Sequence, residues 1–487
     1  MIRSWRYLAG ASLLSLNSLA FAQAPAATPP VAPVGAPQGE DARIEALQQQ
    51  INALQAQVEE LRKTSTATAP SWKGAPQWQD KEAGWSFKPK GFLQFDAGYV
   101  STPGPKLDGT VGGLDYNNLG WNLRDRRIVV GAEGSIPGGF GYNVNFLLSG
   151  GEVGYEDVVL TWSGKKVELA LGHQFPFSSL ETLTSSRFTS FLERASLTEA
   201  FGYTRGMGLT VAYRPLEDVL IQGALLGEGI DDGEDFARTG WQAGVRGVWF
   251  PKVGDGTQLH LAASYQHRNN PRDEQAARYR ARPFTQLTNQ RFVDSGLIAA
   301  DGDDIVGVEL AAINGPVHFA SEAHKLWVRG YAPGKEFGPN NGAGNGLFYN
   351  EDPEFWSAYA EIGYFLTGES RGYRAGKWDR TKVLRPVTEG GPGAIQINAR
   401  IDHLDLSSAT GAGPEIAAPW FVNGGKQTGY AMSVIWAPID YVRFTAQYAR
   451  AHVEGGPRAA TVVPGTKPIL DRSYNVDMFG VRAQVDF

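Results

Sequence analysis

The 487-residue chain contains no cysteine, so disulfides cannot stabilise it. Beyond the first twenty-two residues it also lacks any run of about eighteen uninterrupted apolar residues, which excludes membrane-spanning helices. Its seven histidines show no metal-ligand spacing, and no local group of nucleophile, base and orienting residue predicts an enzyme. We therefore expect no catalysis, no metal or cofactor, and no nucleic-acid partner.

The N-terminus has the layout of a secretory signal. Arg3 and Arg6 precede a short apolar run over 7–19, and Ala20-Phe21-Ala22 forms an A-x-A cleavage site. The composition then divides the chain into further segments. We predict a signal peptide at 1–22, an Ala/Pro linker at 23–40, a coiled coil at 41–63, a polar linker at 64–85 and a membrane domain at 86–487.

The segment 41–63 carries apolar residues at alternating steps of three and four. This spacing defines a heptad seam of about three heptads, too short to be stable as a lone helix. We expect a periplasmic coiled coil whose strand number the seam leaves open, or a single amphipathic helix. The seam residues are Ile44, Leu47, Ile51, Leu54, Val58 and Leu61.

The last ten residues alternate strictly between two kinds of side chain. Phe479, Val481 and Val485 share one parity, whereas Arg482 and Gln484 lie on the other. Side chains alternate across a strand, so one face suits lipid and the other suits water. The 60 glycines, 13 tryptophans and 18 tyrosines also suit a barrel with tight turns and interfacial aromatics. We predict an all-β transmembrane barrel, which supplies stability without disulfides.

Alternation and turn signals predict sixteen strands, an even number as single-chain bacterial barrels require. The predicted strands are 86–100, 126–135, 141–150, 155–162, 167–173, 206–214, 219–227, 239–250, 258–267, 305–313, 318–328, 356–366, 395–405, 429–437, 442–452 and 476–487.

The connections alternate between short turns and long loops, as a barrel with distinct periplasmic and external sides requires. One connection, 367–394, is long yet falls on the short-turn side. We predict that it folds back into the periplasmic mouth, where its cations would attract anions. These basic residues include Arg371, Arg374, Lys377 and Arg380; a solvated surface loop is the alternative.

The loop 268–304 contains Arg278, Arg280 and Arg282, followed by Arg291, with no acidic residue between 275 and 293. In an extended segment the first three arginines share one face, about 6.5–7 Å apart. Guanidinium groups match oxyanions, and a row of weak sites permits conduction. We predict that they line a pore; the alternatives are a charged loop edge or contacts to lipopolysaccharide phosphates.

Two further arginines are candidate lining residues. Arg187 lies in the loop 174–205, which follows the fifth strand and has the position of a constriction loop. That loop carries three arginines and three glutamates, so internal ion pairs are an alternative. Arg127 shares strand parity with Val129 and Glu133, which predicts a lumenal side chain that either stays free or pairs with Glu133.

Several stretches resemble the phosphate-selective porins O and P of Gram-negative outer membranes. They are 123–144 (LRDRRIVVGAEGSIPGGFGYNV), 168–195, 278–296 (RYRARPFTQLTNQRFVDSG), 364–373 (YFLTGESRGY) and the glycine-led hairpins from Gly424. The resemblance implies a homotrimer of sixteen-stranded barrels, loops folded inward from both mouths, and a lumenal arginine ladder. The resemblance implies that this ladder includes the arginines of the matching motif, Arg278, Arg280 and Arg282.

These observations predict an outer-membrane porin for passive diffusion of small anions, phosphate or polyphosphate preferred, through an arginine-lined constriction. The alternatives are a general porin with little ion selectivity, whose arginines pair with carboxylates across the lumen, and a structural barrel that tethers the outer membrane through its coiled coil.

Overall fold

The computed structural model describes residues 40–68, 70–104, 110–111, 114–115, 118–151, 153–230, 240–271, 276–331, 346–410 and 421–487. The chain divides into two compact units, Met1–Thr66 and Ala67–Phe487. The predicted signal peptide and nearly all of the Ala/Pro linker lie outside the described residues.

The first unit contains helix α1 (Glu40–Thr68), which covers the predicted coiled-coil segment and continues five residues beyond it. The seam residues Ile44, Leu47, Ile51, Leu54 and Val58 are all exposed; Leu61 lies outside the described side chains. Their pairing with a partner helix stays a prediction. No described helix is both long and apolar enough to span a membrane.

The segment predicted as a polar linker, 64–85, differs from that expectation. After α1 ends, strands β1 (Ser71–Lys73) and β2 (Ala75–Asp80) form, and β2 pairs antiparallel with the next strand. A cross-strand aromatic pair stabilises the pairing of β2 with that strand: the ring centroids of Trp78 and Phe87 lie 5.9 Å apart. The sheet therefore begins before the first predicted strand.

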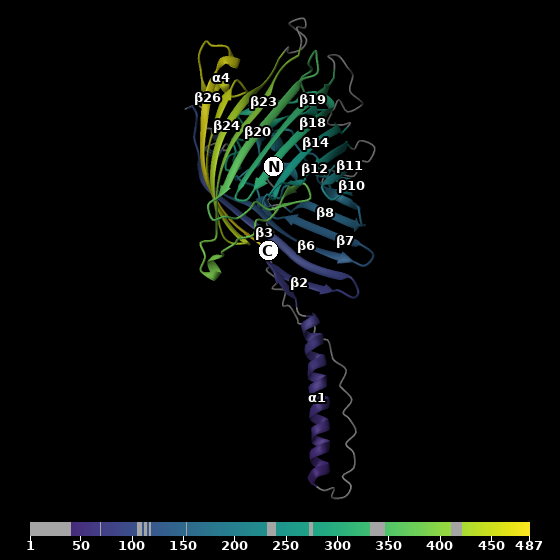
Figure 1. Ribbon diagram of the computed structural model, residues 1–487. Helices are drawn as coiled ribbons and strands as arrows, with labels where there is room; N and C mark the ends of the chain where they lie inside the picture. Colours follow the sequence, from purple (N-terminus) through teal and green to yellow (C-terminus); the bar gives the residue numbers. More distant parts are fainter. Residues whose placement is uncertain are drawn as a thin grey trace, which may run out of the picture. The chain divides into compact units, whose positions relative to one another are not determined.

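Sixteen antiparallel strands of the described residues close into a barrel, since the last strand pairs with the first, with Val481 opposite Ala97 (Figure 1). This confirms the sixteen-stranded prediction. The strands are β3 (Trp85–Val100), β6 (Gly120–Ile136), β7 (Phe140–Leu147), β8 (Gly154–Ser163), β9 (Val167–Gln174), β10 (Gly206–Leu216), β11 (Val219–Gly227), β12 (Trp241–Trp249), β14 (Thr257–Asn269), β18 (Ile298–Asn314), β19 (Val317–Gly330), β20 (Glu354–Phe365), β23 (Ala394–Ala409), β24 (Phe421–Ile439), β25 (Val442–Glu454) and β26 (Ser473–Asp486).

Short elements fill the connections. The strands are β4 (Thr110–Val111), β5 (Leu114–Asp115), β13 (Lys252–Val253), β15 (Ala276–Ala277), β16 (Arg280–Ala281), β17 (Val293–Asp294), β21 (Tyr373–Arg374) and β22 (Lys377–Trp378). The helices are α2 (Leu180–Leu183), α3 (Ser196–Ala200) and α4 (Ala459–Val462), with 3₁₀ turns η1 (Ser149–Gly151), η2 (Val387–Glu389) and η3 (Ile469–Asp471).

Burial on the barrel wall is inverted relative to a soluble protein. On β26, Phe479, Val481 and Val485 are exposed, whereas Arg482 and Gln484 are buried. Exposed aromatics gather near both ends of the strands: Trp241 begins β12 and Trp249 ends it. An apolar outer wall with aromatic residues at both edges is the pattern that a bilayer selects.

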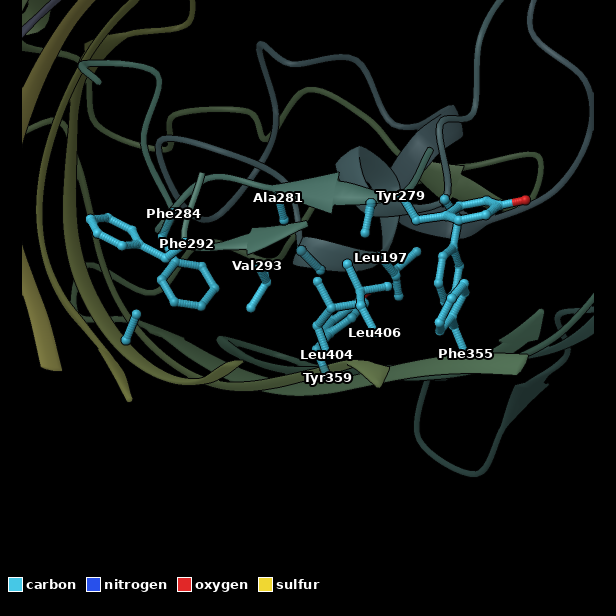
Figure 2. Packing of buried hydrophobic residues seen from close by; sticks show 14 of the residues in the cluster. Leu197, Tyr279, Ala281, Phe284, Phe292, Val293, Phe355, Tyr359, Leu404 and Leu406 are labelled. Carbon is cyan, nitrogen blue, oxygen red and sulfur yellow. The ribbon is translucent and has the colours of Figure 1, made fainter. Parts of the chain in front are cut away.

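The interior of the barrel is filled by connections folded inward. The segment 276–297 forms the β16–β17 hairpin, whose Tyr279, Ala281, Phe292 and Val293 are buried. Figure 2 shows these residues packed toward wall residues of β20 and β23, with Leu197 between them; the wall residues are Phe355, Tyr359, Leu404 and Leu406. Burial of this apolar face orients the hairpin and turns its arginines away from that wall.

Candidate functional site

Three inward-folded segments meet inside the barrel. The constriction loop, defined here as residues 175–205, contacts the periplasmic segment 366–393 where Trp378 N donates to Thr184 Oγ1 at 3.3 Å. From the other side, Arg282 of the β16–β17 hairpin binds Glu199 of the constriction loop at 2.5 Å. The prediction that 367–394 folds into the periplasmic mouth therefore agrees with the structure.

A cavity of about 320 Å³ lies between these segments and one side of the wall. Its lining includes residues from β3, β6, β7 and β8, from the constriction loop, and from the β21–β22 hairpin. Seven lining residues are cationic and three are acidic: Lys90, Arg127, Arg187, Arg194, Arg205, Arg374 and Lys377 against Glu156, Asp157 and Asp379. The lining thus carries an excess of four positive charges at neutral pH.

A β-bulge in β6 directs two successive arginines into the lumen. Gln94 of β3 pairs with Arg127, whereas its neighbour Phe95 pairs with Asp125, so Arg126 is the extra residue. A bulge of this kind puts two successive side chains on one face. Arg126 and Arg127 both reach lumenal partners, and Arg124 donates to the carbonyl of Gln286 at 2.6 Å.

Arg126 is neutralised by the constriction loop. Its guanidinium binds Glu193 at 2.6 and 2.8 Å, and Arg482 of β26 binds the same carboxylate at 3.1 Å. Arg482 also holds Asp96 at 2.6 Å. Burial raises the pKa of Glu193, but Arg126 and Arg482 outweigh it, so the net pKa lies well below the ordinary value. Glu193 is therefore an ionised anchor for the loop.

Three cations of the cavity have no such partner. Within the described residues, no carboxylate oxygen lies within 4.0 Å of Arg127, Arg194 or Lys377. Arg127 donates to Gln94 Oε1 at 3.3 Å, and Arg194 donates to the carbonyls of Glu181 and Thr184. Burial lowers the pKa of Arg194, and nearby Arg205 lowers it further, against the opposing effect of Glu181. A bound anion can therefore supply the negative charge that these three cations lack.

Arg187 lines the cavity, packs against two aromatic rings and donates from Nε to Ser185 Oγ at 3.1 Å. Its guanidinium lies 5.0 Å from the ring centroid of Phe188 and 5.6 Å from that of Phe92. The nearest carboxylate, Asp486, is 3.6 Å away. Burial lowers the pKa of Arg187, and Arg380 adds to this effect while Asp486 opposes it. Its charge is thus only partly compensated.

The opposite side of the lumen is electrically balanced and filled. Arg246 binds Glu309 at 2.6 Å, and Glu309 is also 3.1 Å from His260. Arg400 binds both Glu181, at 2.8 Å, and Glu361. These carboxylates offset their arginines, so Arg246 and Arg400 add no uncompensated positive charge to this side of the lumen.

The hairpin arginines are more fully paired than the sequence interpretation assumed. Arg278 binds Asp294, just beyond the acid-free window, at 2.6 Å, and Glu199 holds Arg282 and, at 3.5 Å, Arg291. Only Arg280 of the predicted ladder has no ion pair among the described residues. Burial and the neighbouring Arg282 lower the pKa of Arg291 to about 10, although Glu199 opposes them.

The periplasmic cations divide into two groups. Arg374 and Lys377 line the large cavity, and Arg374 pairs with Asp379 at 2.9 Å. Arg371 and Arg380 instead line a smaller cavity nearby, where Arg380 binds Asp486. All four residues line cavities of the lumen, and their role as a basic periplasmic mouth stays a prediction.

Sequence reasoning overlooked Arg124, Arg126 and Arg194 as lumenal residues. The signal for the first two was the cluster Arg124-Asp125-Arg126-Arg127, which strict alternation splits between the two faces. The bulge is the reason that all three arginines of this cluster lie in the lumen. Arg127 was expected to face inward and does so, but Glu133 pairs with Lys90 at 2.8 Å rather than with Arg127. Among the described residues, no cluster of metal-ligating side chains is present.

A closed sixteen-stranded barrel with an apolar outer wall and a charged, loop-filled lumen defines an outer-membrane porin. Residues 109–487 match the model of the phosphate-selective porin O and P family, and the chain belongs to that family. The protein accordingly resides in the outer membrane of a Gram-negative cell, and its family and fold are those of a channel rather than an enzyme.

Two relatives illustrate the family. The chain is 34% identical over 432 residues to an uncharacterized protein of Caulobacter vibrioides, covering 87% of this chain and 78% of that protein. It is 24% identical over 359 residues to Porin O of Pseudomonas aeruginosa, covering 68% of this chain and 76% of the relative. Among solved structures, an anion-selective porin from Comamonas acidovorans aligns with 10% identity and a TM-score of 0.47, covering 83% and 100% of the two chains.

Proposed function

We propose that this porin passes small anions by passive diffusion, with phosphate or polyphosphate preferred, along the cationic side of its lumen. The observation that carries the proposal is the set of three cavity cations, Arg127, Arg194 and Lys377, that lack a carboxylate within 4.0 Å among the described residues. Arg127 and Arg194 are half-buried, so each is partly removed from water without a counter-charge, and a passing oxyanion relieves that cost. Lys377 is exposed and adds to the positive field of the cavity.

The cations continue beyond the cavity, which supports a preference for polyvalent anions. Arg124 has Arg126 and Arg282 as electrostatic neighbours, and Arg282 in turn lies near Arg291 and Arg280. On the periplasmic side, Arg187 lies near Arg380. A chain of phosphates would contact several of these cations at once. It would move from one weak site to the next without binding tightly to any of them.

Single-channel recording tests the proposal. In a salt gradient the reversal potential should indicate anion selectivity, and millimolar phosphate should reduce the chloride current. The double variant Arg127→Gln/Arg194→Gln should weaken that block about tenfold or more, because each charge-assisted hydrogen bond contributes roughly 1.5–3 kcal/mol. The double variant Arg450→Gln/Arg458→Gln, which removes the same charge from exposed positions, is the control.

A general porin of weak selectivity is the competing function, favoured by the pairs that Arg278 and Arg282 make with carboxylates. A near-zero or cation-selective reversal potential in the wild-type channel would establish it instead. Replacement of Arg280 alone tests whether the arginine ladder predicted at 278–282 contributes to selectivity separately from the cavity. Arg280 is the residue of that ladder without an ion pair in the described structure.

We also propose a homotrimer, with the exposed seam of α1 joining helices of different copies. Light scattering in detergent should give three chains per particle, and deletion of 41–63 should leave conductance unchanged. Altered envelope integrity in cells carrying that deletion would support the additional tethering role. Lipopolysaccharide phosphates are the expected partners of the outward rim, where Arg450 and Lys426 lie exposed.

A further inference from the structure

A second and smaller cavity lies on the periplasmic side of the lumen, behind Phe188. Its volume is about 50 Å³, whereas one water molecule needs roughly 10–15 Å³ by this measure. It shares Arg187, Phe188 and Asp379 with the large cavity. The rest of its wall comes from the periplasmic segment, the β24–β25 turn and the ends of β20, β23, β24, β25 and β26. The space therefore suits one small polyatomic ion.

Four guanidinium groups line this cavity: Arg187, Arg371, Arg380 and Arg443. Asp486 compensates two of them, because it binds Arg380 and lies 3.6 Å from Arg187. The remaining two carboxylates of the lining are engaged elsewhere. Asp379 binds Arg374 at 2.9 Å, and Asp440 accepts a hydrogen bond from the backbone N–H of Val383 at 2.8 Å.

Arg371 and Arg443 therefore have no carboxylate within 4.0 Å in the described part of the chain. They bind the constriction loop instead. Arg371, only 5% exposed, donates to the carbonyl of Phe188 at 2.5 Å and to Ser190 Oγ at 2.9 Å. Arg443 donates to the carbonyls of Arg187, at 2.8 Å, and Thr189.

The Nε–H of Arg443 is buried without a hydrogen-bond partner among the described residues, and Arg371 is the like charge that acts most strongly on Arg443. Two uncompensated guanidiniums in one cavity wall repel each other, which is costly when they are buried. A single oxyanion in the cavity would offset that repulsion through charge-assisted hydrogen bonds.

We infer that this cavity holds a resident small oxyanion, of phosphate-like size and charge, bound by Arg371 and Arg443. The ion fastens residues 187–190 of the constriction loop, the periplasmic segment and β25 together. We assign this ion a structural role rather than a role in permeation, so the inference does not rest on anion selectivity.

Thermal unfolding of the purified full-length protein in detergent tests the inference, with inorganic phosphate as the probe. The protein is first dialysed into a buffer whose anions, such as gluconate, are too bulky for the cavity. Added phosphate should then raise the unfolding midpoint in a saturable way. Because a conducting site must stay weak, we expect half-saturation at about tenfold or more below the phosphate concentration that half-blocks the current.

Variants separate this cavity from the large one. Arg371→Gln and Arg443→Gln should lose the phosphate-dependent rise, whereas Arg127→Gln in the large cavity and exposed Arg450→Gln should keep it. Equilibrium dialysis of the wild-type protein with radioactive phosphate should find one tightly bound ion per chain, a readout that does not require the variants to fold. Absence of tight binding to wild type, or full retention of the rise in Arg443→Gln, overturns the inference.

Discussion

Arg126 and Glu193 form a two-pronged ion pair, at 2.6 and 2.8 Å, which joins the bulge of β6 to the constriction loop. The pair cancels one lumenal cation and at the same time positions the loop that forms the cationic cavity. The carboxylate of Glu193 thus both anchors the constriction loop and sets part of the charge that determines ion selectivity.

Glu193→Gln should make the channel more anion-selective, because removal of the carboxylate frees the charges of Arg126 and Arg482. It should also loosen the loop and lower the temperature of unfolding. Reversal potentials and thermal denaturation measure the two effects. Glu217→Gln, which removes the same charge from an exposed turn, is the control; an identical selectivity shift in both variants would contradict a local effect.

The pH dependence of this anchor has a definite sign. The folded-state pKa of Glu193 is lowered, so its stabilisation is complete above the ordinary glutamate pKa of about 4.3 and declines as pH falls toward the lower folded value. We expect the difference in unfolding temperature between wild type and Glu193→Gln to be constant from pH 7 to about 5 and to shrink below about pH 4. A difference that grows on acidification would refute this assignment.

Deletion of Arg126 should remove the β-bulge and restore regular pairing in β6. Asp125 already pairs with Phe95 and Arg124 with Asp96, so after the deletion Asp125 stays on the outer face and Arg124 stays in the lumen. The deletion and Arg126→Gln remove the same charge, so reversal potentials should show an equal fall in anion selectivity in both variants. A much larger fall in the deletion variant would contradict this register.

Phe292→Ala should weaken docking of the β16–β17 hairpin. Its ring is fully buried and packs against Tyr474 with centroids 5.9 Å apart, so truncation should cost about 3–5 kcal/mol. The expected result is earlier loss of protease resistance in the hairpin, measured by limited proteolysis, with the barrel itself intact. An unchanged cleavage rate would exclude the hairpin as a separately docked element.

Val481→Arg places a cation on the outer wall of β26, where the native side chain is exposed. If this face contacts the bilayer interior, the substitution should cost about 2–4 kcal/mol of folding stability in lipid vesicles. Gln484→Arg on the opposite, lumenal face should not carry that lipid penalty, although it adds charge to a buried network. Reversible urea unfolding in vesicles compares the two.

The strands were predictable because alternation is a property of consecutive residues, and β26 illustrates it in its Phe479–Phe487 pattern. Inward folding of 366–393 was equally accessible, because its length contradicted its place among short turns. The locations of Arg127 and Arg187 also followed from parity and loop position.

The pairing of the charges was not predictable. Glu199 is separated from Arg282 by more than eighty residues, and local sequence gives no sign that the two loops meet. The bulge at Arg126 was hidden for a related reason, since an extra residue in one strand is defined only against its partner β3. The ladder expected at 278–282 is accordingly largely neutralised, while the unpaired cations lie elsewhere.

The constriction loop is fastened to the junction between the two ends of the barrel sequence. Arg482 of β26 binds both Asp96 of β3 and the carbonyl of Leu192, and Gln94 of β3 binds Gln484 and the carbonyl of Ser186. These docking groups exist together only after the final strand has joined the first. Truncation of β26 would therefore remove the contacts of Arg482 and Gln484 with the loop and leave it held on the far wall, where Glu322, Glu361 and Asp402 bind it.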